Sequence, residues 1–132
     1  MIKISIKKKI AGAAILVKNP EGEILLLKRA PESHFAPDQW GFPGGKIEDG
    51  ETPLQAVIRE THEETQLVVH DVRPLGVIND VVEAFFTDQY EGHVKIDFEH
   101  TDSKWVAPLD LNKYDLAPSV IEIHEKVKDC DY

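Results

Sequence analysis

The feature that most constrains this chain is a set of glutamates that share one face of a predicted helix. Thr52-Pro53 is typical of a helix start, because threonine caps the first turn and proline suits the first helical position. A helix from there to about Thr65 places Glu60, Glu63 and Glu64 within one third of its circumference, since each residue turns the helix by about 100°. Like charges at these spacings destabilise an isolated helix by roughly 0.2–0.5 kcal/mol per pair, so another interaction must compensate for them.

The opposite side of the predicted helix is apolar. Leu54, Val57, Ile58 and Thr61 follow the spacing i, i+3, i+4, i+7, which predicts that this stripe packs on the core. A hard divalent cation would compensate the repulsion among the glutamates, because Mg²⁺ binds carboxylate oxygens together with substrate phosphates. The alternative is a solvated acidic face without a ligand, which is the usual meaning of a run of glutamates.

The spacing around these glutamates is more specific than the glutamates alone. The segment 45–67 resembles the Nudix box, which is a glycine, five residues, a glutamate, seven residues, Arg-Glu, an aliphatic residue, any residue, Glu-Glu, any residue, a glycine and an aliphatic residue. Seven of the nine specified positions match: Gly45, Glu51, Arg59, Glu60, Glu63, Glu64 and Leu67. The preceding segment 40–44, Trp-Gly-Phe-Pro-Gly, is similar to the lead-in of MutT-like members of the family.

The resemblance implies a fold and an activity. It implies one Nudix hydrolase domain over residues 1–132, of the α/β class, built as a Nudix-type α/β/α sandwich with a mixed sheet. It also implies metal-dependent hydrolysis of a nucleoside diphosphate that is linked to another moiety. Two positions depart from the box, because Thr61 replaces an aliphatic residue and Gln66 replaces the final glycine. A left-handed residue is favoured just after a helix, so glutamine there is expected to cost on the order of 1 kcal/mol.

The resemblance also assigns a metal site within the box. Glu60, Glu63 and Glu64 resemble the metal ligands of the family, and the carbonyl of Gly44 is a further candidate ligand. Mg²⁺ is the expected ion, with Mn²⁺ as the alternative. The ligands are all oxygen atoms, as a hard divalent cation prefers.

Two further features complete the predicted catalytic set. Arg59 is expected to pair with Glu51 and to hold the box rigid, because a guanidinium binds a carboxylate through two hydrogen bonds. The attacking water needs a proton acceptor, and Glu99 is the candidate for this base or for an extra metal ligand. The segment 99–105 resembles the region that carries a loop carboxylate in MutT-like enzymes. Glu60 is the alternative base.

Three residues are candidates for binding the substrate. Arg29 matches a phosphate-contacting arginine of MutT-like enzymes, and an exposed strand end is the alternative for it. Trp40 and Phe42 are candidates to stack on a base, and a position in the core is their alternative. MutT-like oxidised-guanine hydrolases use an asparagine shortly after a proline near the final helix. Serine and valine follow Pro118 here, so the sequence does not favour oxidised-guanine specificity.

Three functions remain open. The first is hydrolysis of a nucleoside triphosphate to a nucleoside monophosphate and pyrophosphate. The second is hydrolysis of a dinucleoside polyphosphate, a nucleotide sugar or an RNA 5′ end, and the third is a weakly active domain that binds a nucleotide as a sensor. The intact glutamates favour an enzyme, whereas Gln66 mildly favours the sensor.

The remaining elements follow from apolar periodicity and turn residues. Strands are expected at 2–6, 10–17, 24–27, 67–69, 77–86 and 94–98. The turn 19–22, Asn-Pro-Glu-Gly, should join its two flanking strands into a hairpin, and the prolines and glycines of 30–45 predict an irregular loop. A final helix is expected over 118–128 with Ser119 as its cap. The inner face of that helix should consist of Val120, Ile123, His124 and Val127.

Charge and composition exclude several classes of protein. A net charge of −9 repels a long polyphosphate backbone, so general nucleic-acid binding is not expected, whereas a small nucleotide-like substrate can bind with divalent cations. The start of the chain alternates isoleucine with lysine or serine, unlike a signal peptide, and the longest apolar run, 10–17, is too short to span a membrane. The single cysteine, Cys130, favours a reducing cytoplasm, and the sequence leaves both a monomer and a homodimer open.

Overall fold

The computed structural model describes residues 9–132, and the strand expected at 2–6 lies outside the described residues. The strands are β1 (Gly12–Val17), β2 (Ile24–Arg29), β3 (Trp40–Gly41), β4 (Gly44–Lys46), β5 (Val68–His70), β6 (Arg73–Ile78), β7 (Val82–Thr87), β8 (Gln89–Glu91) and β9 (His100–Val106). The helices are α1 (Pro53–Thr65), the 3₁₀ helix η1 (Pro108–Lys113) and α2 (Val120–Asp129).

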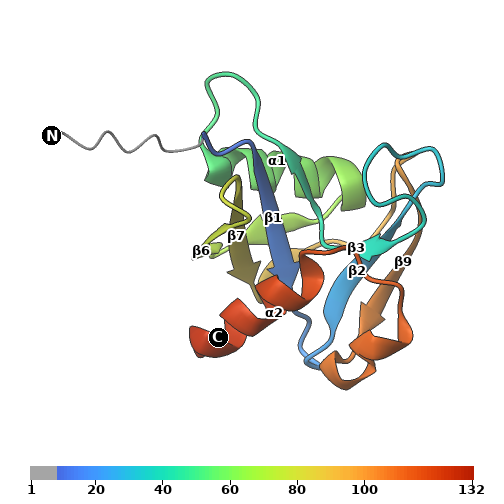
Figure 1. The fold of residues 1–132 in the computed structure, drawn as a ribbon. Helices are drawn as coiled ribbons and strands as arrows, with labels where there is room; N and C mark the ends of the chain where they lie inside the picture. Colours follow the sequence, from blue (N-terminus) through green and yellow to red (C-terminus); the bar gives the residue numbers. More distant parts are fainter. Residues whose placement is uncertain (1–8) are drawn as a thin grey trace, which may run out of the picture.

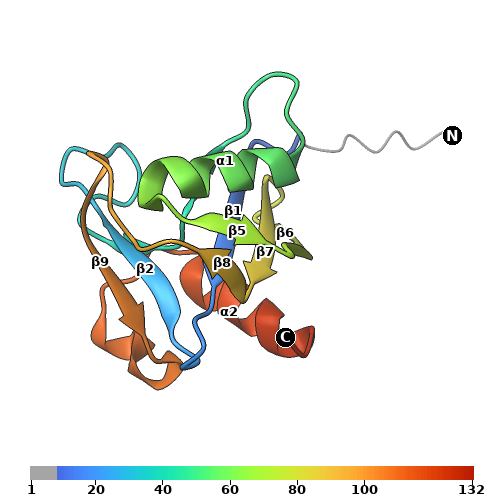
Figure 2. The same ribbon diagram turned by 180° about the vertical axis from the view of Figure 1, so that it is seen from behind.

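The strands form layers between the two α-helices. One sheet has the order β4-β1-β7-β6, in which β1 and β7 are parallel and the other neighbours are antiparallel. A second sheet has the order β3-β2-β9, and β5 pairs with β8. Helix α1 packs on β1 and β4, whereas α2 packs on β6, and Figures 1 and 2 show the two helices on opposite sides of the strands. The predicted α/β/α sandwich with a mixed sheet is therefore confirmed.

Two apolar cores fill the space between these layers. The α1 core contains Ile15, Val17 and Val57, and the α2 core contains Leu16 and Ile123. Successive residues of β1 thus enter opposite cores, because side chains alternate along a strand. Both faces of β1 are buried, which explains why its sequence is continuously apolar.

The predicted hairpin is wrong. The turn at 19–22 forms, with the Asn19 side chain accepting hydrogen bonds from the backbone of Glu21 at 3.1 Å and Glu23 at 2.8 Å. The strands on either side of it nevertheless enter different sheets and share only the bridge between Lys18 and Ile24. Strand β1 pairs instead with β4 and β7, which lie far along the chain, so local turn chemistry did not decide the pairing.

The predicted irregular loop at 30–45 contains β3 and the start of β4, so this prediction is partly wrong. Gly44 pairs with Ala14 of β1 at a φ of 155°, and a side chain on Gly44 would collide with the backbone of Ala13. The glycine that suggested a loop is instead what lets a strand approach this closely.

Two further predicted strands differ from the structure. The segment 77–86 is divided by a turn at Asn79-Asp80, where both residues have positive φ, and its two parts belong to β6 and β7. The segment 94–98 forms no strand. Its backbone N–H groups at Lys95 and Asp97 donate to the last carbonyls of α1, over 2.9 and 3.3 Å, because the end of a helix leaves those acceptors unpaired.

Both helices form where predicted. Thr52 and Gln55 form a reciprocal cap at the start of α1, which confirms the predicted cap. Ser119 precedes α2, but its side chain makes no capping hydrogen bond. The inner face of α2 is buried at Val120, Ile123 and Val127, as predicted, whereas His124 is only partly buried.

The predicted inner face of α1 is wrong in part. Leu54 and Ile58 are 41% and 37% exposed, whereas Thr61 and Glu64 are buried. The helix is rotated so that Glu60 and Glu64 face β4, while Glu63 stays exposed to solvent. Thr61 is fully buried, and its hydroxyl has no hydrogen-bond partner among the described residues.

No helix in the described part of the chain combines the length and apolar character that crossing a membrane requires.

Candidate active site on α1

The site begins with a close contact between α1 and β4. A Cβ atom on Gly45 would lie 2.6 Å from the carboxyl carbon of Glu60, so a side chain at this position would displace the Glu60 carboxylate. Ala56, one turn earlier on the helix, is fully buried. These small residues let the glutamate side of α1 lie directly against the backbone of β4.

Glu64 is buried in this contact at 3% exposure. One of its carboxyl oxygens accepts a hydrogen bond from the backbone N–H of Gly44 at 2.8 Å. Burial is the main cause that raises the pKa of Glu64 to about 9; the neighbouring carboxylates of Glu60, Asp97 and Glu99 act in the same direction, and the Gly44 hydrogen bond opposes the shift. A buried acid of this kind holds its charge only beside a compensating cation.

Glu60 and Glu99 belong to the same acidic cluster. Burial is the main cause that raises the pKa of Glu60, and the charges of Glu63 and Glu99 add to it, while Arg59 opposes the shift. Glu99 is an exposed residue of the turn before β9. The structure therefore brings the predicted loop carboxylate close enough for its charge to raise the pKa of both Glu60 and Glu64.

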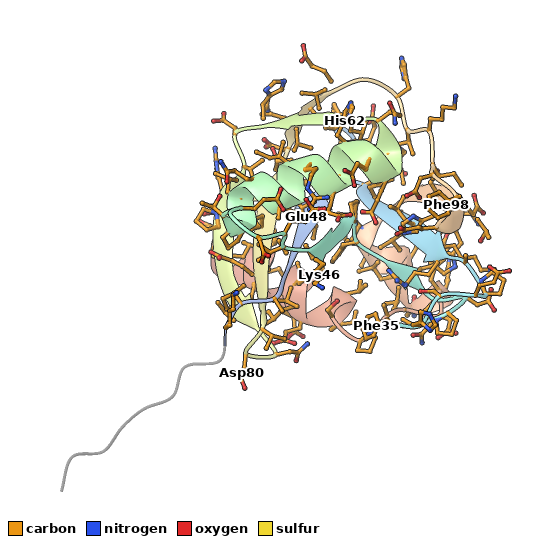
Figure 3. All side chains as sticks on the ribbon, turned by 90° about the horizontal axis from the view of Figure 1, so that it is seen from above. Phe35, Lys46, Glu48, His62, Asp80 and Phe98 are labelled. Carbon is orange, nitrogen blue, oxygen red and sulfur yellow. The ribbon has the colours of Figure 1, made fainter. Side chains whose placement is uncertain are left out.

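The predicted pairing of Arg59 with Glu51 is present. The guanidinium donates from Nε and Nη2 to the two oxygens of Glu51 at 2.8 and 2.9 Å, which is the two-point geometry expected of arginine. This pair lowers the pKa of Glu51 to about 2 and raises that of Arg59. Arg59 also donates to the carbonyl of Lys46 at 3.1 Å, so it ties the helix to β4; Figure 3 labels Lys46 beside α1.

The same guanidinium holds two of the predicted metal ligands. Its Nη1 donates to Glu60 at 3.0 Å and to Glu63 at 3.2 Å. In the described residues 9–132 no three acidic, histidine or cysteine side chains already converge on one point as a metal site would need. In this arrangement Glu60 and Glu63 are hydrogen-bonded to Arg59.

The donor set still fits a hard divalent cation. The buried Glu64 carboxyl and the half-buried Glu60 repel each other, and both lie beside the Gly44-Gly45 backbone. Rotation of the Glu60 and Glu63 side chains away from Arg59 would add their oxygens to that of Glu64. The carbonyl of Gly44 as a further ligand stays a prediction.

Sequence reasoning missed a buried imidazole behind Glu64. His100 is 6% exposed, its Nδ1 is 2.8 Å from a carboxylate oxygen of Asp97, and its Nε2 is 3.8 Å from Glu64. The segment 94–98, for which the sequence predicts a strand, carries Asp97 to this place. The one available signal was that His100 directly follows the candidate base Glu99.

A cavity of about 290 Å³ lies next to the acidic cluster, between β1, the β3–β4 segment and the start of α2. We call it the inner cavity. Arg29, Phe42 and Gly44 border it, together with Asn79 and Pro118. The structure thus gathers two of the three predicted substrate-binding residues at one cavity.

Trp40 takes the alternative position. It is 8% exposed, belongs to the α2 core, and its ring meets that of Tyr114 edge to face at a centroid distance of 5.3 Å. This geometry supports a core role for Trp40 rather than stacking on a base.

Known proteins match this chain over most of its length. The model of the NUDIX domain family matches residues 8–127. The chain is 49% identical over 57 residues to an 8-oxo-dGTP diphosphatase of Escherichia coli K12, an alignment that covers 43% of each protein. It is 32% identical over 119 residues to the nucleoside triphosphatase NudI of E. coli O139:H28, covering 76% of this chain and 84% of that protein.

Solved structures share the fold. The crystal structure of a MutT NUDIX hydrolase from Burkholderia pseudomallei superposes with a TM-score of 0.78 at 26% identity, over 91% of this chain and 98% of that one. The likeness to this solved structure therefore extends over nearly the whole chain and is not confined to the box.

Proposed function

The chain belongs to the Nudix family of pyrophosphohydrolases, and from this premise we propose that it hydrolyses a nucleoside triphosphate to a nucleoside monophosphate and pyrophosphate with Mg²⁺. Two similar proteins support the substrate class, since one is named as an 8-oxo-dGTP diphosphatase and the other as a nucleoside triphosphatase. The observation that carries the proposal is the buried Glu64 carboxyl beside Glu60, held against the Gly44-Gly45 backbone.

The proposed metal ligands are Glu60, Glu63 and Glu64, with the carbonyl of Gly44. A bound Mg²⁺ would withdraw charge from the phosphoryl oxygens and make water a better nucleophile. The carboxylates would keep the bound ion at a fixed position, because α1 packs directly on β4. Arg59 holds Glu60 and Glu63 through its hydrogen bonds to both, and metal binding would require these two side chains to rotate away from it.

The bond changes follow from this arrangement. The oxygen of a water molecule bonds to the α-phosphorus, the bond from this phosphorus to the bridging oxygen breaks, and pyrophosphate leaves with that oxygen. Glu99 accepts a proton from the water in our proposal, because it is exposed to solvent and adjoins the acidic cluster. Glu60 is the alternative acceptor.

The inner cavity is the proposed nucleoside site. Phe42 offers an apolar wall for the base, and the positive charge of Arg29 suits a phosphate. Ser119 borders the cavity just after Pro118, where an asparagine would favour oxidised guanine, so we propose no preference for that base.

The test is product analysis with a panel of nucleoside triphosphates in Mg²⁺, comparing the wild type with Glu63→Gln. Glu63 is exposed, so the substitution should leave the fold intact. We expect nucleoside monophosphate and pyrophosphate as products, and a loss of turnover on the order of a hundredfold or more in the variant.

The matched control is His62→Gln, an exposed neighbour on the same helix, which should keep wild-type turnover. A Glu63→Gln enzyme that retains wild-type turnover would overturn the metal-site assignment. Tight nucleotide binding without any product would favour the sensor instead.

A further inference from the structure

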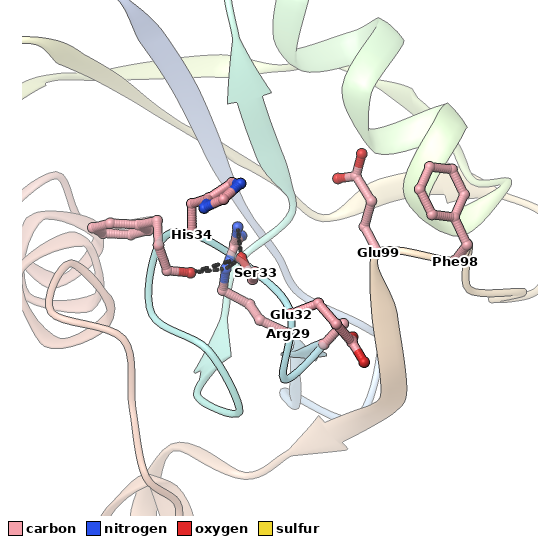
Figure 4. A pocket seen from close by; sticks show the side chains of 8 residues that line it. Arg29, Glu32, Ser33, His34, Phe98 and Glu99 are labelled. Carbon is pink, nitrogen blue, oxygen red and sulfur yellow. Dashed lines mark hydrogen bonds between the residues drawn. The ribbon is translucent and has the colours of Figure 1, made fainter.

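A cavity of about 220 Å³ lies beside α2, at the end of β1 that is remote from the acidic cluster. We call it the α2 cavity. Figure 1 shows α2 lying across this end of β1. The cavity shown in Figure 4, by contrast, is bordered by Arg29 and Glu99 and belongs to the active site described above. The α2 cavity is bordered by none of the proposed metal ligands or substrate-binding residues, so the proposed hydrolysis does not explain it.

The charged side chains that border the α2 cavity are all basic. Lys18 and Lys128 border it together with the imidazole of His124, and no acidic residue does. This is a local reversal of charge, because the chain has 24 acidic residues against 15 lysines and arginines. Within residues 9–132 neither lysine side chain forms an ion pair or a hydrogen bond. Positive charge that gathers at a cavity without a counter-ion attracts an anion.

The pKa of His124 reflects this uncompensated charge. Burial is the main cause that lowers the pKa, the charge of Lys128 acts in the same direction, and Glu125 opposes the shift. The imidazole is therefore mostly uncharged at neutral pH. In this form it offers a hydrogen bond to an anion without adding to the repulsion between the two lysines.

The rest of the wall is apolar. Leu16, Ile24 and Val127 belong to the α2 core and also border the cavity. Tyr132 borders it too, and its ring stacks on Phe86 at a centroid distance of 5.1 Å, which holds this part of the wall in place. An apolar cavity of about 150 Å³ is enough for a benzene molecule. The α2 cavity therefore has room for one six-membered ring and one small charged group.

We propose that the α2 cavity binds a phosphate monoester of a small apolar group, with the phosphate at Lys18 and Lys128 and the apolar group against Leu16 and Val127. Ligand sites combine a mostly apolar wall with a few polar groups in this way. A lysine ammonium binds a phosphate as a point charge, and two lysines match the two charges of a monoester. The inference is independent of the proposed function, because Gly44 and the acidic cluster lie at the opposite end of β1.

The test measures the binding of phenyl phosphate to the full chain by calorimetry, without Mg²⁺, in the wild type and in the single variants Lys18→Gln and Lys128→Gln. Loss of one charge-assisted contact should weaken binding about tenfold in each variant. Both lysines reach solvent, so both variants should fold. The matched control is Lys126→Gln, which removes a lysine of the same helix that does not border the cavity and should keep wild-type affinity.

Two simpler probes separate the charge from the ring. Inorganic phosphate carries the charge alone and phenol carries the ring alone, so each should bind at least about tenfold more weakly than phenyl phosphate. The imidazole of His124, assigned by NMR with the variant His124→Gln, gives a readout that needs no lysine variant. Saturation with phenyl phosphate should raise the pKa of His124, because a nearby anion stabilises the imidazolium form.

Each contrary result overturns a defined part of the proposal. Undetectable binding of phenyl phosphate, wild-type affinity in both lysine variants, or an unchanged pKa of His124 at saturation would overturn the site. Binding that is lost in Arg29→Gln and kept in the lysine variants would place the anion at the active site instead. Equal affinity for inorganic phosphate would overturn the assigned ligand class. Turnover of nucleoside triphosphates is measured separately, so failure of this site leaves the proposed function untouched.

Discussion

The two α-helices differ in the kind of side chain that they bury. Helix α2 buries only apolar residues, with Ile123 fully enclosed, and leaves Ile121 exposed, whereas α1 buries the charged residue Glu64 and leaves Leu54 and Ile58 partly in water. A helix that obeys its own amphipathic pattern stabilises the fold, and a helix that violates it is usually retained for a chemical purpose. The contrast therefore separates a structural helix from a functional one within the same small domain.

Replacing Glu64 with glutamine should give the largest effect and should fall on activity. Glutamine has the same size, and the raised pKa of about 9 means that the carboxyl is uncharged at neutral pH without metal, so the free energy of unfolding should hardly change. Turnover should fall on the order of a hundredfold or more. Kinetics and chemical denaturation on the same sample measure turnover and the free energy of unfolding separately. A variant with a much lower free energy of unfolding but wild-type turnover would contradict the distinction between the two helices.

Ile123→Ala makes the reciprocal test on α2. Deleting a fully buried aliphatic side chain should lower the free energy of unfolding by about 2–5 kcal/mol, through lost burial and a new cavity. Turnover at a temperature where the variant remains folded should stay near that of the wild type. Loss of activity in the folded variant would show that α2 also shapes the site.

Mg²⁺ should stabilise the protein through α1 alone. A ligand that binds only the folded state adds about 2.7 kcal/mol at a hundredfold excess over its Kd. The melting temperature should rise with millimolar Mg²⁺ in the wild type and by the same increment in Ile123→Ala, but much less in Glu64→Gln. An identical increment in all three proteins would place the ion elsewhere.

Thr61→Val should stabilise α1. The Thr61 hydroxyl is buried without a hydrogen-bond partner among residues 9–132, and valine has nearly the same shape. Removing the unsatisfied group should raise the free energy of unfolding by about 1 kcal/mol, measured by chemical denaturation. Thr65, also buried, has its hydroxyl bonded to the Thr61 carbonyl, so Thr65→Val is the control that should not stabilise.

Gln66→Gly should have the smallest effect. Gln66 ends α1 at a φ of 66°, the left-handed conformation expected for the missing glycine of the box. Glycine avoids the Cβ clash but loosens the unfolded chain, so the net gain should be only about 0.3–1 kcal/mol. Kinetics on the same variant should match the wild type. A hundredfold gain in turnover would identify Gln66 as an inactivating substitution and would favour the sensor.

Much of this domain follows from sequence because much of it is local. The cap of α1, the left-handed Gln66, the inner face of α2 and the Arg59–Glu51 pair are all set by residues close in sequence or on one helix. The spacing of the box also predicted which glutamates of α1 belong to the acidic cluster.

The errors lie where distant segments meet. No local pattern shows that β1 pairs with β7 rather than with β2, since both choices bury the same apolar residues. The buried side of α1 depends on the glycine backbone of β4, which admits the Glu64 carboxyl on the side opposite the predicted apolar stripe. His100 and Asp97 reach Glu64 only through the path of the segment 94–98, which no periodicity encodes.

The attachment of that segment to α1 has a consequence for how the site opens. Lys95 and Asp97 donate their backbone hydrogens to the last carbonyls of the helix, at Thr65 and Glu64. Backbone groups that share such bonds exchange their hydrogens with solvent as one cooperative unit. The loop that leads to Glu99 cannot then loosen on its own, because its release also frays the end of the helix that carries Glu64. We therefore expect the acidic cluster to open in a single local-unfolding event, whose free energy amide exchange at Lys95 and Asp97 would measure.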